Sequence, residues 1–518
     1  MTAFRLRRPV GEWEHGWSLS VRVQENDIIK LRSRLGDLLI RANLVSVEQV
    51  SAALVLQAEK GGRLGDNLVA TSALSQSELD DFLQRTPAEP MDLEATGIDP
   101  DELLSLLMKL VHNGRLASVR QFVDAIKLPR HVVLALVRMA VDRKLIFTLG
   151  LRNSDSALDM KYAFTDEGLR WTVDAFQRTR YAGPAPVSLE AFTEQVNRQK
   201  FTNELVTIER IRECLSDLSF EESIHEQSGP ALSSGRAILL YGPPGNGKTS
   251  LALRLANMFT DIIYVPYAVM VNGQIIIVHD PRIHSSPEPA SVRDENAPVQ
   301  PFEEYDTRWV PCKRPVVATG GELTLDMLDL RYDELSRFYE APLHMKVLGG
   351  CFVIDDFGRQ SVSPNQLLNR LMVPLENRID HMKLDTGSSF SIPFQELVIF
   401  STNLDPEDLI ETAFLRRLPY KIEIVPPTLD IYKRIFAKEC ELRGLQMDDE
   451  PFDLVVRMIR DEAGLNLAAF QPKFIIDQVF AICRFMGQAP RFDAHSLSYA
   501  IHNLDIKRRS PRALPALS

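Results

Sequence analysis

The spacing of apolar positions changes several times along this chain of 518 residues. Residues 34–86 and 101–145 carry apolar residues three to four positions apart, which is typical of amphipathic helices. From about residue 190, short apolar runs alternate with helical patterns, and this order predicts a parallel α/β sheet. Residues 428–505 return to helical spacing. The pattern therefore predicts several domains, as the length of the chain also does.

One stretch near the N-terminus occurs twice. RLGDLLIRANLVSVEQVSAALVLQ (residues 34–57) and RLGDNLVATSALSQSELDDFLQRT (residues 63–86) have the same length, and their first residues lie 63 − 34 = 29 positions apart. Each copy predicts a short helix that opens at R-L-G and a second helix that begins near Ser46 or Ser75. The simplest interpretation of this N-terminal repeat (residues 34–86) is a duplicated helical hairpin whose leucines form a small core.

Residues 101–180 predict three helices followed by two strands, an order that looks like a winged helix. This stretch holds 13 Lys/Arg and 9 Asp/Glu, a net charge of 13 − 9 = +4, whereas the whole chain has −11. In a winged helix the third helix reads DNA, and in this chain it carries Arg130, His131, Arg138, Arg143 and Lys144. A balance of +4 is small for a nucleic-acid footprint, so a protein-contact or spacer role is favoured over DNA binding.

The strongest motif follows a predicted buried strand at residues 237–241. Residues 242–249 (GPPGNGKT) fit the phosphate-loop pattern G-x-x-x-x-G-K-[ST], and an amphipathic helix follows them. Glycines let backbone N–H groups turn inward around phosphate oxygens, Lys248 would meet the β- and γ-phosphates, and Thr249 would hold Mg²⁺. The motif predicts an ATP and Mg²⁺ site made by Gly242, Pro243, Pro244, Gly245, Asn246, Gly247, Lys248, Thr249 and Ser250.

Polar residues also end two later predicted strands. Asp355 and Asp356 follow an apolar run, where Asp355 would ligate Mg²⁺ and Asp356 would orient the attacking water. Asn403 ends a further apolar run and is able to reach the γ-phosphate or its water. Arg416 and Arg417 come next. An arginine can neutralise transition-state charge, but these two can equally be interpreted as surface charges.

From about residue 190 to 505 the chain resembles an AAA+ ATPase module. The family's motifs match Walker A at residues 242–249, Walker B at residues 353–356, sensor 1 at Asn403 and an arginine finger at Arg416 or Arg417. The resemblance also implies a helical lid whose arginine senses the γ-phosphate, and in the matching region this chain offers Lys473. The second Walker B acid is usually Glu in the family, whereas here it is Asp356.

Two further stretches resemble MoxR-type and enhancer-binding ATPases. The run FYEAPLHMKVLGGCFVIDD resembles their approach to Walker B. Apolar and polar residues alternate on each side of Thr386-Gly387, which resembles the pre-sensor-1 hairpin of the same group. The resemblance implies a homo-oligomeric ring, usually a hexamer, that remodels an unknown protein substrate. A hairpin that only caps the sheet is the alternative.

The N-terminal repeat looks like the MshEN-type domain of type II secretion and type IV pilus ATPases, which has two 24-residue R-L-G motifs joined by five residues. Residues 58–62 match that spacer. The family implies binding of cyclic di-GMP (c-di-GMP), here at Arg34, Leu35, Gly36, Gln57, Arg63, Leu64 and Gly65. Arginine can pair with guanine O6 and N7, and helix N-termini attract phosphate. Asn43, Ser72 and Thr86 depart from the family's pattern. A purely structural or docking role is the alternative.

Composition bears on the cellular compartment, on membrane insertion and on nucleic-acid binding. The five cysteines are scattered without a C-x-x-C pair, which favours reduced thiols and a cytoplasmic protein. The first residues lack the apolar core of a signal peptide, and no apolar run is long enough to span a bilayer, so we expect no membrane insertion. The net charge of −11 argues against holding nucleic acid by charge alone.

These interpretations predict a multidomain chain. Its expected parts are an N-terminal leader (1–30), an MshEN-type duplicated helical domain (31–90), a winged-helix domain (98–181), a linker (182–200), an AAA+ α/β P-loop core (201–427), an α-helical lid (428–505) and a C-terminal tail (506–518). We expect a c-di-GMP-responsive AAA+ ATPase that hydrolyses MgATP to remodel a partner protein as a ring. The alternative is a winged-helix DNA-binding regulator whose P-loop module serves nucleotide-dependent assembly.

Overall fold

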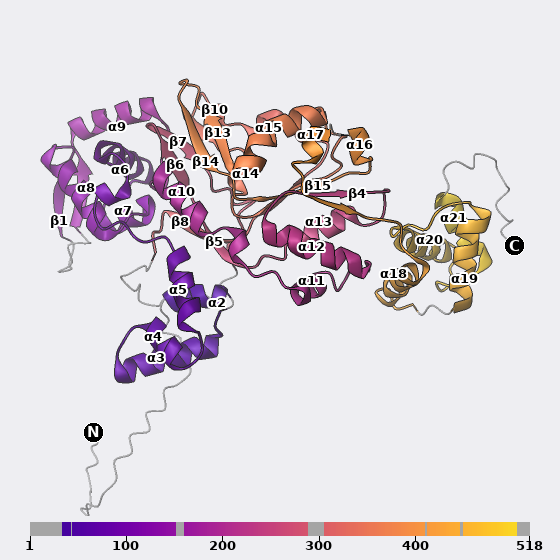
Figure 1. Ribbon diagram of the computed structural model, residues 1–518. Coiled ribbons are helices and arrows are strands. Elements are labelled where there is room, and N and C mark those ends of the chain that lie inside the picture. The colour runs from indigo at the N-terminus through magenta and orange to yellow at the C-terminus, as the bar shows by residue number, and fades with distance from the viewer. Residues whose placement is uncertain are drawn as a thin grey trace, which may run out of the picture. The chain divides into compact units, whose positions relative to one another are not determined.

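The computed structural model describes residues 34–42, 44–151, 160–287, 305–409, 412–445 and 449–504 (Figure 1). The expected leader (1–30) and tail (506–518) and Asn43 lie outside the described residues. The described chain divides into two compact units, one that ends at Leu79 and one that begins at Asp80.

The first unit contains the helices of the N-terminal repeat. They are α2 (Arg34–Arg41), α3 (Val47–Lys60), α4 (Leu64–Ala70) and the start of α5 (Gln76–Arg85). The second helix of each copy begins where the sequence predicts, because a serine caps it. Ser46 Oγ accepts from the Gln49 amide while the Gln49 side chain accepts from the Ser46 amide, and Ser75 and Glu78 repeat the arrangement. Five of the six leucines that the two copies share are buried, as a small core requires, whereas Leu83 is 47 % exposed.

The second unit begins with three helices and a hairpin. The elements are α6 (Pro100–Gly114), α7 (Val119–Ile126), α8 (Arg130–Asp142), β1 (Ile146–Leu151), β2 (Met160–Phe164) and α9 (Asp166–Arg178). Strands β1 and β2 pair antiparallel. The buried faces of α6, α7 and α8 form one core cluster, which includes the fully buried Phe122 and Leu136. The order of helices and strands is the one expected for residues 98–181, and the assignment to the winged-helix class stays a prediction.

A five-stranded parallel sheet forms the centre of the second unit. Its strands in spatial order are β16 (Tyr420–Glu423), β4 (Ile238–Tyr241), β15 (Leu397–Ser401), β12 (Cys351–Ile354) and β9 (Val316–Thr319). Every neighbouring pair is parallel. Most positions of these strands are fully buried because helices cover both faces, as is usual for parallel sheets. The predicted parallel α/β core is therefore confirmed.

Helices lie on both faces of this sheet (Figure 1). One face packs on α11 (Ile208–Cys214), α12 (Glu222–Ser234) and α13 (Lys248–Ala256). The other face packs on α15 (Pro364–Asn377), α17 (Thr412–Leu415) and the residues just after α14 (Leu343–Lys346). Along β12 the side chains alternate between these two clusters, with Val353 facing the first and Phe352 the second.

A second five-stranded sheet lies beside α10 (Leu189–Arg198), and the sequence indicates only its hairpin, through the two apolar runs joined by Asn272-Gly273. Its order is β10 (Arg331–Asp333), β11 (Phe338–Glu340), β7 (Gln274–Ile277), β6 (Ala268–Val271) and β3 (Val187–Ser188). The expectation of a linker at residues 182–200 is wrong, because this stretch contains both β3 and α10. Phe192 and Val196 of α10 are buried in the hydrophobic cluster that also contains residues of β6, β7 and β11. A two-residue strand leaves no period to detect.

Two further strand pairs and the C-terminal helices lie outside these two sheets. Strands β5 (Ile262–Pro266) and β8 (Trp309–Lys313) pair antiparallel, as do β13 (Ile379–Lys383) and β14 (Ser389–Pro393). The second pair is the hairpin predicted around Thr386-Gly387. The C-terminal helices are α18 (Leu429–Glu441), α19 (Asp449–Arg457), α20 (Gln471–Phe485) and α21 (Ala494–Leu504). Throughout the part of the chain that the structure describes, helices are too short or too polar to cross a membrane.

Candidate nucleotide-binding site

The predicted site residues follow three neighbouring strands of the central sheet. The phosphate loop follows β4, Asp355 and Asp356 follow β12, and Asn403 lies two residues after β15. Because β4, β15 and β12 are parallel neighbours, their carboxyl ends lie at one edge of the sheet. This edge is where α/β sheets bind ligands.

The phosphate loop has the backbone that its glycines permit. Gly242, Gly245 and Gly247 have φ of 130°, 78° and 89°, values that residues with a side chain rarely adopt. A Cβ at Gly242 would lie 2.5 Å from the carbonyl oxygen of Ile424, so only glycine fits there. Helix α13 begins at Lys248, directly after the loop, and the loop therefore lies at a helix N-terminus, where phosphate is favoured.

The side chain of Lys248 lies against the loop. Its Nζ donates to the carbonyl oxygens of Gly242 and Pro243, both at 2.8 Å. Burial lowers the pKa of this ammonium group, and the carboxylates of Asp355 and Asp356 oppose the shift. Those two carboxylates therefore lie close enough to act on Lys248, as a site for a nucleotide phosphate and a cation requires.

Thr249 and Asp355 form a pair of oxygen ligands. Thr249 Oγ1 donates to Asp355 Oδ2 at 2.7 Å, although the two residues are 106 positions apart in sequence. Hydroxyl and carboxylate oxygens are the donors that Mg²⁺ takes beside phosphates. The chemistry of this pair therefore fits the metal that the sequence predicts.

Asp356 and Asn403 form a second polar pair. Asn403 Nδ2 donates to Asp356 Oδ1 at 2.9 Å. The backbone of Asp356 has a φ of 48°, in the left-handed region that a residue with a side chain enters only at an energetic cost. Strained backbone of this kind clusters at functional sites.

The two adjacent arginines differ in their surroundings. Arg417 Nε donates to the carboxylate of Glu376 on α15. Arg416 follows α17 and is exposed, with neither an ion pair nor a hydrogen bond identified for it in the described chain. The exposed arginine is the better candidate for contacting another molecule.

The C-terminal helices meet the phosphate loop through residues that the sequence did not single out. The Phe470 amide donates to the Gly245 carbonyl at 2.9 Å, and the Ala469 amide donates to Asn246 Oδ1 at 3.2 Å. A Cβ at Gly245 would lie 2.4 Å from the Phe470 ring. Lys473 lies one turn further along and is exposed. An aromatic residue at the start of α20 was the only sequence signal for this contact.

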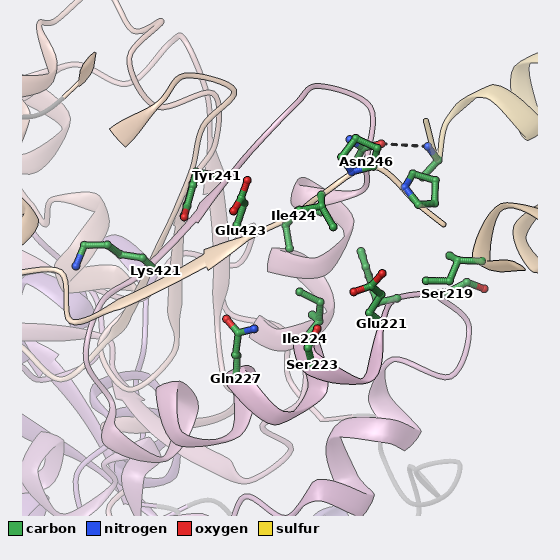
Figure 2. Close-up of a pocket in the computed structure, with 16 residues that line it drawn as sticks. Ser219, Glu221, Ser223, Ile224, Gln227, Tyr241, Asn246, Lys421, Glu423 and Ile424 are labelled. Carbon is green, nitrogen blue, oxygen red and sulfur yellow. Dashed lines mark hydrogen bonds between the residues drawn. The ribbon is translucent and has the colours of Figure 1, made fainter. Parts of the chain in front are cut away.

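A cavity of about 360 Å³ lies beside the phosphate loop (Figure 2). Its walls come from the start of α12, from β4 and β16, and from the C-terminal helices. Asn246 of the loop lies at one side, and Ile224 of α12 and Ile424 lie below it in the view. Sequence reasoning missed this cavity because most of its lining comes from separate segments outside the phosphate-loop motif.

The c-di-GMP candidates in the N-terminal repeat lie mostly on its packing side. Leu35 and Leu64 are 9 % and 4 % exposed, so their side chains serve the core. Gln57 Nε2 donates to the Gly62 carbonyl at 2.9 Å, within the spacer between the two copies. Arg63 is exposed.

The other c-di-GMP candidates give less support for a binding site. Gly36 and Gly65 are buried, and the side chain of Arg34 lies outside the described residues. Ser72, where the family has glycine, has a φ of 55°, which explains why glycine suits that position.

Comparisons with known proteins match separate parts of the chain. A family model described as "Domain of unknown function (DUF8689)" matches residues 428–503, which are the C-terminal helices. The Type IV pilus assembly ATPase PilB of Myxococcus xanthus is 39 % identical over 82 residues, which is 16 % of this chain and 14 % of that protein. The chain thus spans about a seventh of the length of this relative.

Among solved structures, the Thermotoga maritima RuvB Holliday junction branch migration motor is similar to the chain at a TM-score of 0.32 and 16 % identity. The match covers 57 % of this chain and 74 % of that one. A RuvB mutant from the same organism gives a TM-score of 0.31 at 16 % identity, over 59 % of this chain and 73 % of the other. Values this low add nothing to what the sheet order already shows.

Proposed function

We propose that this chain is an AAA+ ATPase that binds and hydrolyses MgATP at the edge of the central sheet. The observation that carries the proposal is the convergence of four groups from distant parts of the sequence. The phosphate loop, Asp355, Asp356 and Asn403 meet at the carboxyl ends of three adjacent parallel strands. An arrangement with this loop and these carboxylates suits phosphoryl transfer to water.

Each residue has a role in this reaction. Loop amides and Lys248 would hold the phosphates, and Thr249 and Asp355 would hold Mg²⁺, which when bound would supply positive charge against the phosphate oxygens. Asp356, oriented by Asn403, accepts the proton of the attacking water as its oxygen bonds to the γ-phosphorus. The bond from that phosphorus to the bridging oxygen breaks, and ADP and phosphate leave.

The cavity beside the loop is proposed to take the adenine base. It borders Asn246 of the loop, and Ile224 and Ile424 offer apolar surface to a flat ring. A cavity of about 360 Å³ lies within the range of small-molecule sites.

Two variants test the ATPase proposal. Lys248→Ala is expected to abolish tight binding of a fluorescent ATP analogue. Asp356→Asn is expected to retain that binding while phosphate release falls by about 10²–10⁴-fold. Wild-type turnover no faster than that of Lys248→Ala, across protein concentrations and with c-di-GMP present, would contradict the proposal. The Asp356→Asn protein also serves to capture the unknown protein substrate in the presence of ATP.

The active assembly is proposed to be a ring, expected to be a hexamer, in which Arg416 contacts the γ-phosphate of a neighbouring subunit. Arg416 is exposed, whereas Arg417 is paired with Glu376. Mixing Arg416→Ala subunits with Asp356→Asn subunits should restore part of the activity, because mixed interfaces contain one intact site. Arg417→Ala is the matched control and should lose less turnover. A protein that stays monomeric with ATP and keeps constant specific activity would exclude the ring.

The N-terminal repeat is proposed to bind c-di-GMP and to regulate turnover. The motif match and the exposed Arg63 support this proposal. Calorimetry on the full chain with c-di-GMP should show binding that the Arg34→Ala/Arg63→Ala variant loses. Equal binding by the variant, or no heat for the wild type, would leave a structural repeat.

The DNA-binding alternative has one observation in its favour, because Arg130 and Arg138 of α8 are exposed. Arg143, directly after the helix, is engaged within the protein. Arg143 pairs with Asp101 at 2.6 Å and also lies over the Trp171 ring. Salt-dependent retention on duplex DNA would favour this alternative.

A further inference from the structure

A buried polar cluster centres on Arg314, in the loop between β8 and β9. The side chain of Arg314 is 2 % exposed. Its Nε donates to Glu204 Oε1 at 2.9 Å, and its Nη1 donates to the carbonyl oxygens of Gln199 and Gly349 at 3.0 and 2.5 Å. Its Nη2 lies 3.7 Å from Asp261 Oδ2. One guanidinium thus ties its own loop to three segments that are distant from it in sequence.

Helix α5 reaches this cluster at its last residue. Arg85 Nη1 lies 2.5 Å from Asp261 Oδ2, and the Arg85 carbonyl accepts from Gln195 Nε2 at 2.6 Å. Gln195 also donates to Gln199, whose carbonyl binds Arg314. The same helix begins in the N-terminal repeat, where its Leu79 is buried. The last residues of α5 therefore belong to the same unit as the cluster, and Arg85 ties the end of this helix to it.

Helix α13 ends beside the same cluster. The amides of Thr260 and Asp261, just beyond the helix, donate to the Glu204 carboxylate at 3.4 and 3.3 Å. Arg210 also donates to this carboxylate, at 3.3 Å. The opposite end of α13 carries Thr249, in its first turn. A shift of the cluster along the helix axis would therefore move Thr249.

Strand β12 begins at the cluster and ends at the candidate site. Arg314 holds the carbonyl of Gly349, two residues before β12, and Asp355 directly follows the strand. The Cys351 amide donates to the Pro315 carbonyl at 2.9 Å, which further fixes the start of the strand. The Arg314 cluster thus contacts the segment that follows α13 and the segment that precedes β12. Thr249 and Asp355 lie at the opposite ends of this helix and this strand, so one cluster helps to position both.

We propose that the Arg85–Asp261–Arg314 cluster couples displacement of α5 to the nucleotide site, with Arg314 as a positioning residue for the Thr249–Asp355 pair. This inference rests on the proposed ATPase function and extends it to the route of regulation. An arginine buried among carboxylates and carbonyls keeps its partners, because an unpaired buried charge is costly. The cluster therefore moves as a unit instead of absorbing the displacement of α5.

Hydrogen–deuterium exchange of the full chain, without nucleotide, tests the coupling. Arg85→Ala is expected to raise exchange several-fold in peptides 258–264 and 349–356, because Asp261 loses its 2.5 Å ion pair and keeps only the longer contact with Arg314. Arg143→Ala is the matched control, since it breaks an ion pair of 2.6 Å with Asp101 elsewhere in the same unit. It should leave both peptides unchanged. Unchanged exchange of 349–356 in Arg85→Ala would overturn the proposal.

A second variant acts from within the repeat. A Cβ at Gly65 would lie 2.9 Å from the Leu79 side chain, so Gly65→Val pushes on α5. Its exchange in 349–356 should rise above that of the wild type, and the Gly65→Val/Arg85→Ala double variant should exchange no faster there than Arg85→Ala alone. A further rise of the double variant over Arg85→Ala would overturn the route through Arg85.

Nucleotide affinity separates this proposal from the ATPase proposal. If ATP binds, Gly65→Val should change its dissociation constant in the wild-type background and not in the Arg85→Ala background. If ATP does not bind at all, the ATPase proposal fails while the exchange experiment still decides the coupling.

Discussion

The N-terminal repeat and the candidate nucleotide site are built from opposite kinds of contact. In the repeat, the caps join residues three positions apart, such as Ser46 and Gln49, and the leucines pack within one short segment. At the candidate site, Thr249 and Asp355 bond across 106 positions, and Asn403 and Asp356 across 47. The repeat is therefore assembled from neighbouring parts of one short stretch of sequence, whereas the site exists only when three strands pair in register.

If long-range contacts hold the second unit together, the largest loss of stability is expected from a substitution of Arg314. Arg314→Ala leaves Glu204 buried without its main partner and should cost about 3–5 kcal/mol of stability in the second unit. Arg63→Ala in the repeat removes an exposed side chain and should change stability by no more than about 0.5 kcal/mol. Calorimetric unfolding of the full chain measures both. Equal losses would mean that the cluster does not hold the core together.

A substitution in the repeat should separate the two regions. Leu68 is fully buried, and Leu68→Ala should cost about 2–5 kcal/mol in the first unit. Nucleotide binding should survive, because none of the proposed ATP contacts lies in that unit. The measurement is a thermal melt with and without ATP. An ATP-dependent transition that disappears together with the repeat would show that the two regions fold as one.

A buried carboxyl group in the second unit should make the stability of that unit depend on pH. Glu396 is fully buried just before β15, and desolvation raises its pKa well above the ordinary value of 4.5, with Asp380 adding to the shift and Arg378 opposing it. Because the pKa of Glu396 is higher in the folded than in the unfolded protein, this group stabilises the fold fully at pH values below its pKa in the unfolded chain. The contribution is lost as the pH rises through the pKa of Glu396 in the folded protein. Melting temperature should therefore fall with rising pH, and Glu396→Gln should flatten that fall. A variant with the same pH profile as the wild type would exclude this role.

The smallest expected effect concerns backbone conformation. Ser72 of the repeat has a φ of 55°, and Ser72→Gly should stabilise the first unit by roughly 1 kcal/mol, because glycine enters this region without steric cost. Chemical denaturation of the full chain, followed by a probe in the repeat, measures the change. A loss of stability would show that chain entropy outweighs the relieved strain.

The sequence predicted those parts of the fold that short segments specify. The phosphate loop, the capped helices at Ser46 and Ser75 and the hairpin at Thr386-Gly387 all depend on residues within one stretch. The parallel core was predictable because runs such as residues 351–354 are apolar at every position, as strands covered on both faces require.

The rest could not be predicted, because it depends on where separate segments meet. Strand β3 has two residues and pairs with β6, 82 positions later by the register of Val187 with Val269 (269 − 187). The contact of Phe470 with Gly245 and the cluster around Arg314 join segments that carry no motif for one another. Arg314 in the sequence is one arginine among many, and what distinguishes it, burial together with its contacts to Glu204 and Gly349, appears only in the fold.

The order of strands in the central sheet also bears on how the chain folds as it is made. Ile238 of β4 pairs with Ile399 on one side and with Tyr420 on the other. The second pairing must wait for 420 − 238 = 182 further residues. At about 5–20 residues per second, the strand before the phosphate loop spends roughly 10–40 s without that neighbour. Synthesis therefore completes the N-terminal repeat well before the sheet that it is proposed to regulate, and the apolar face of β4 needs protection on the ribosome.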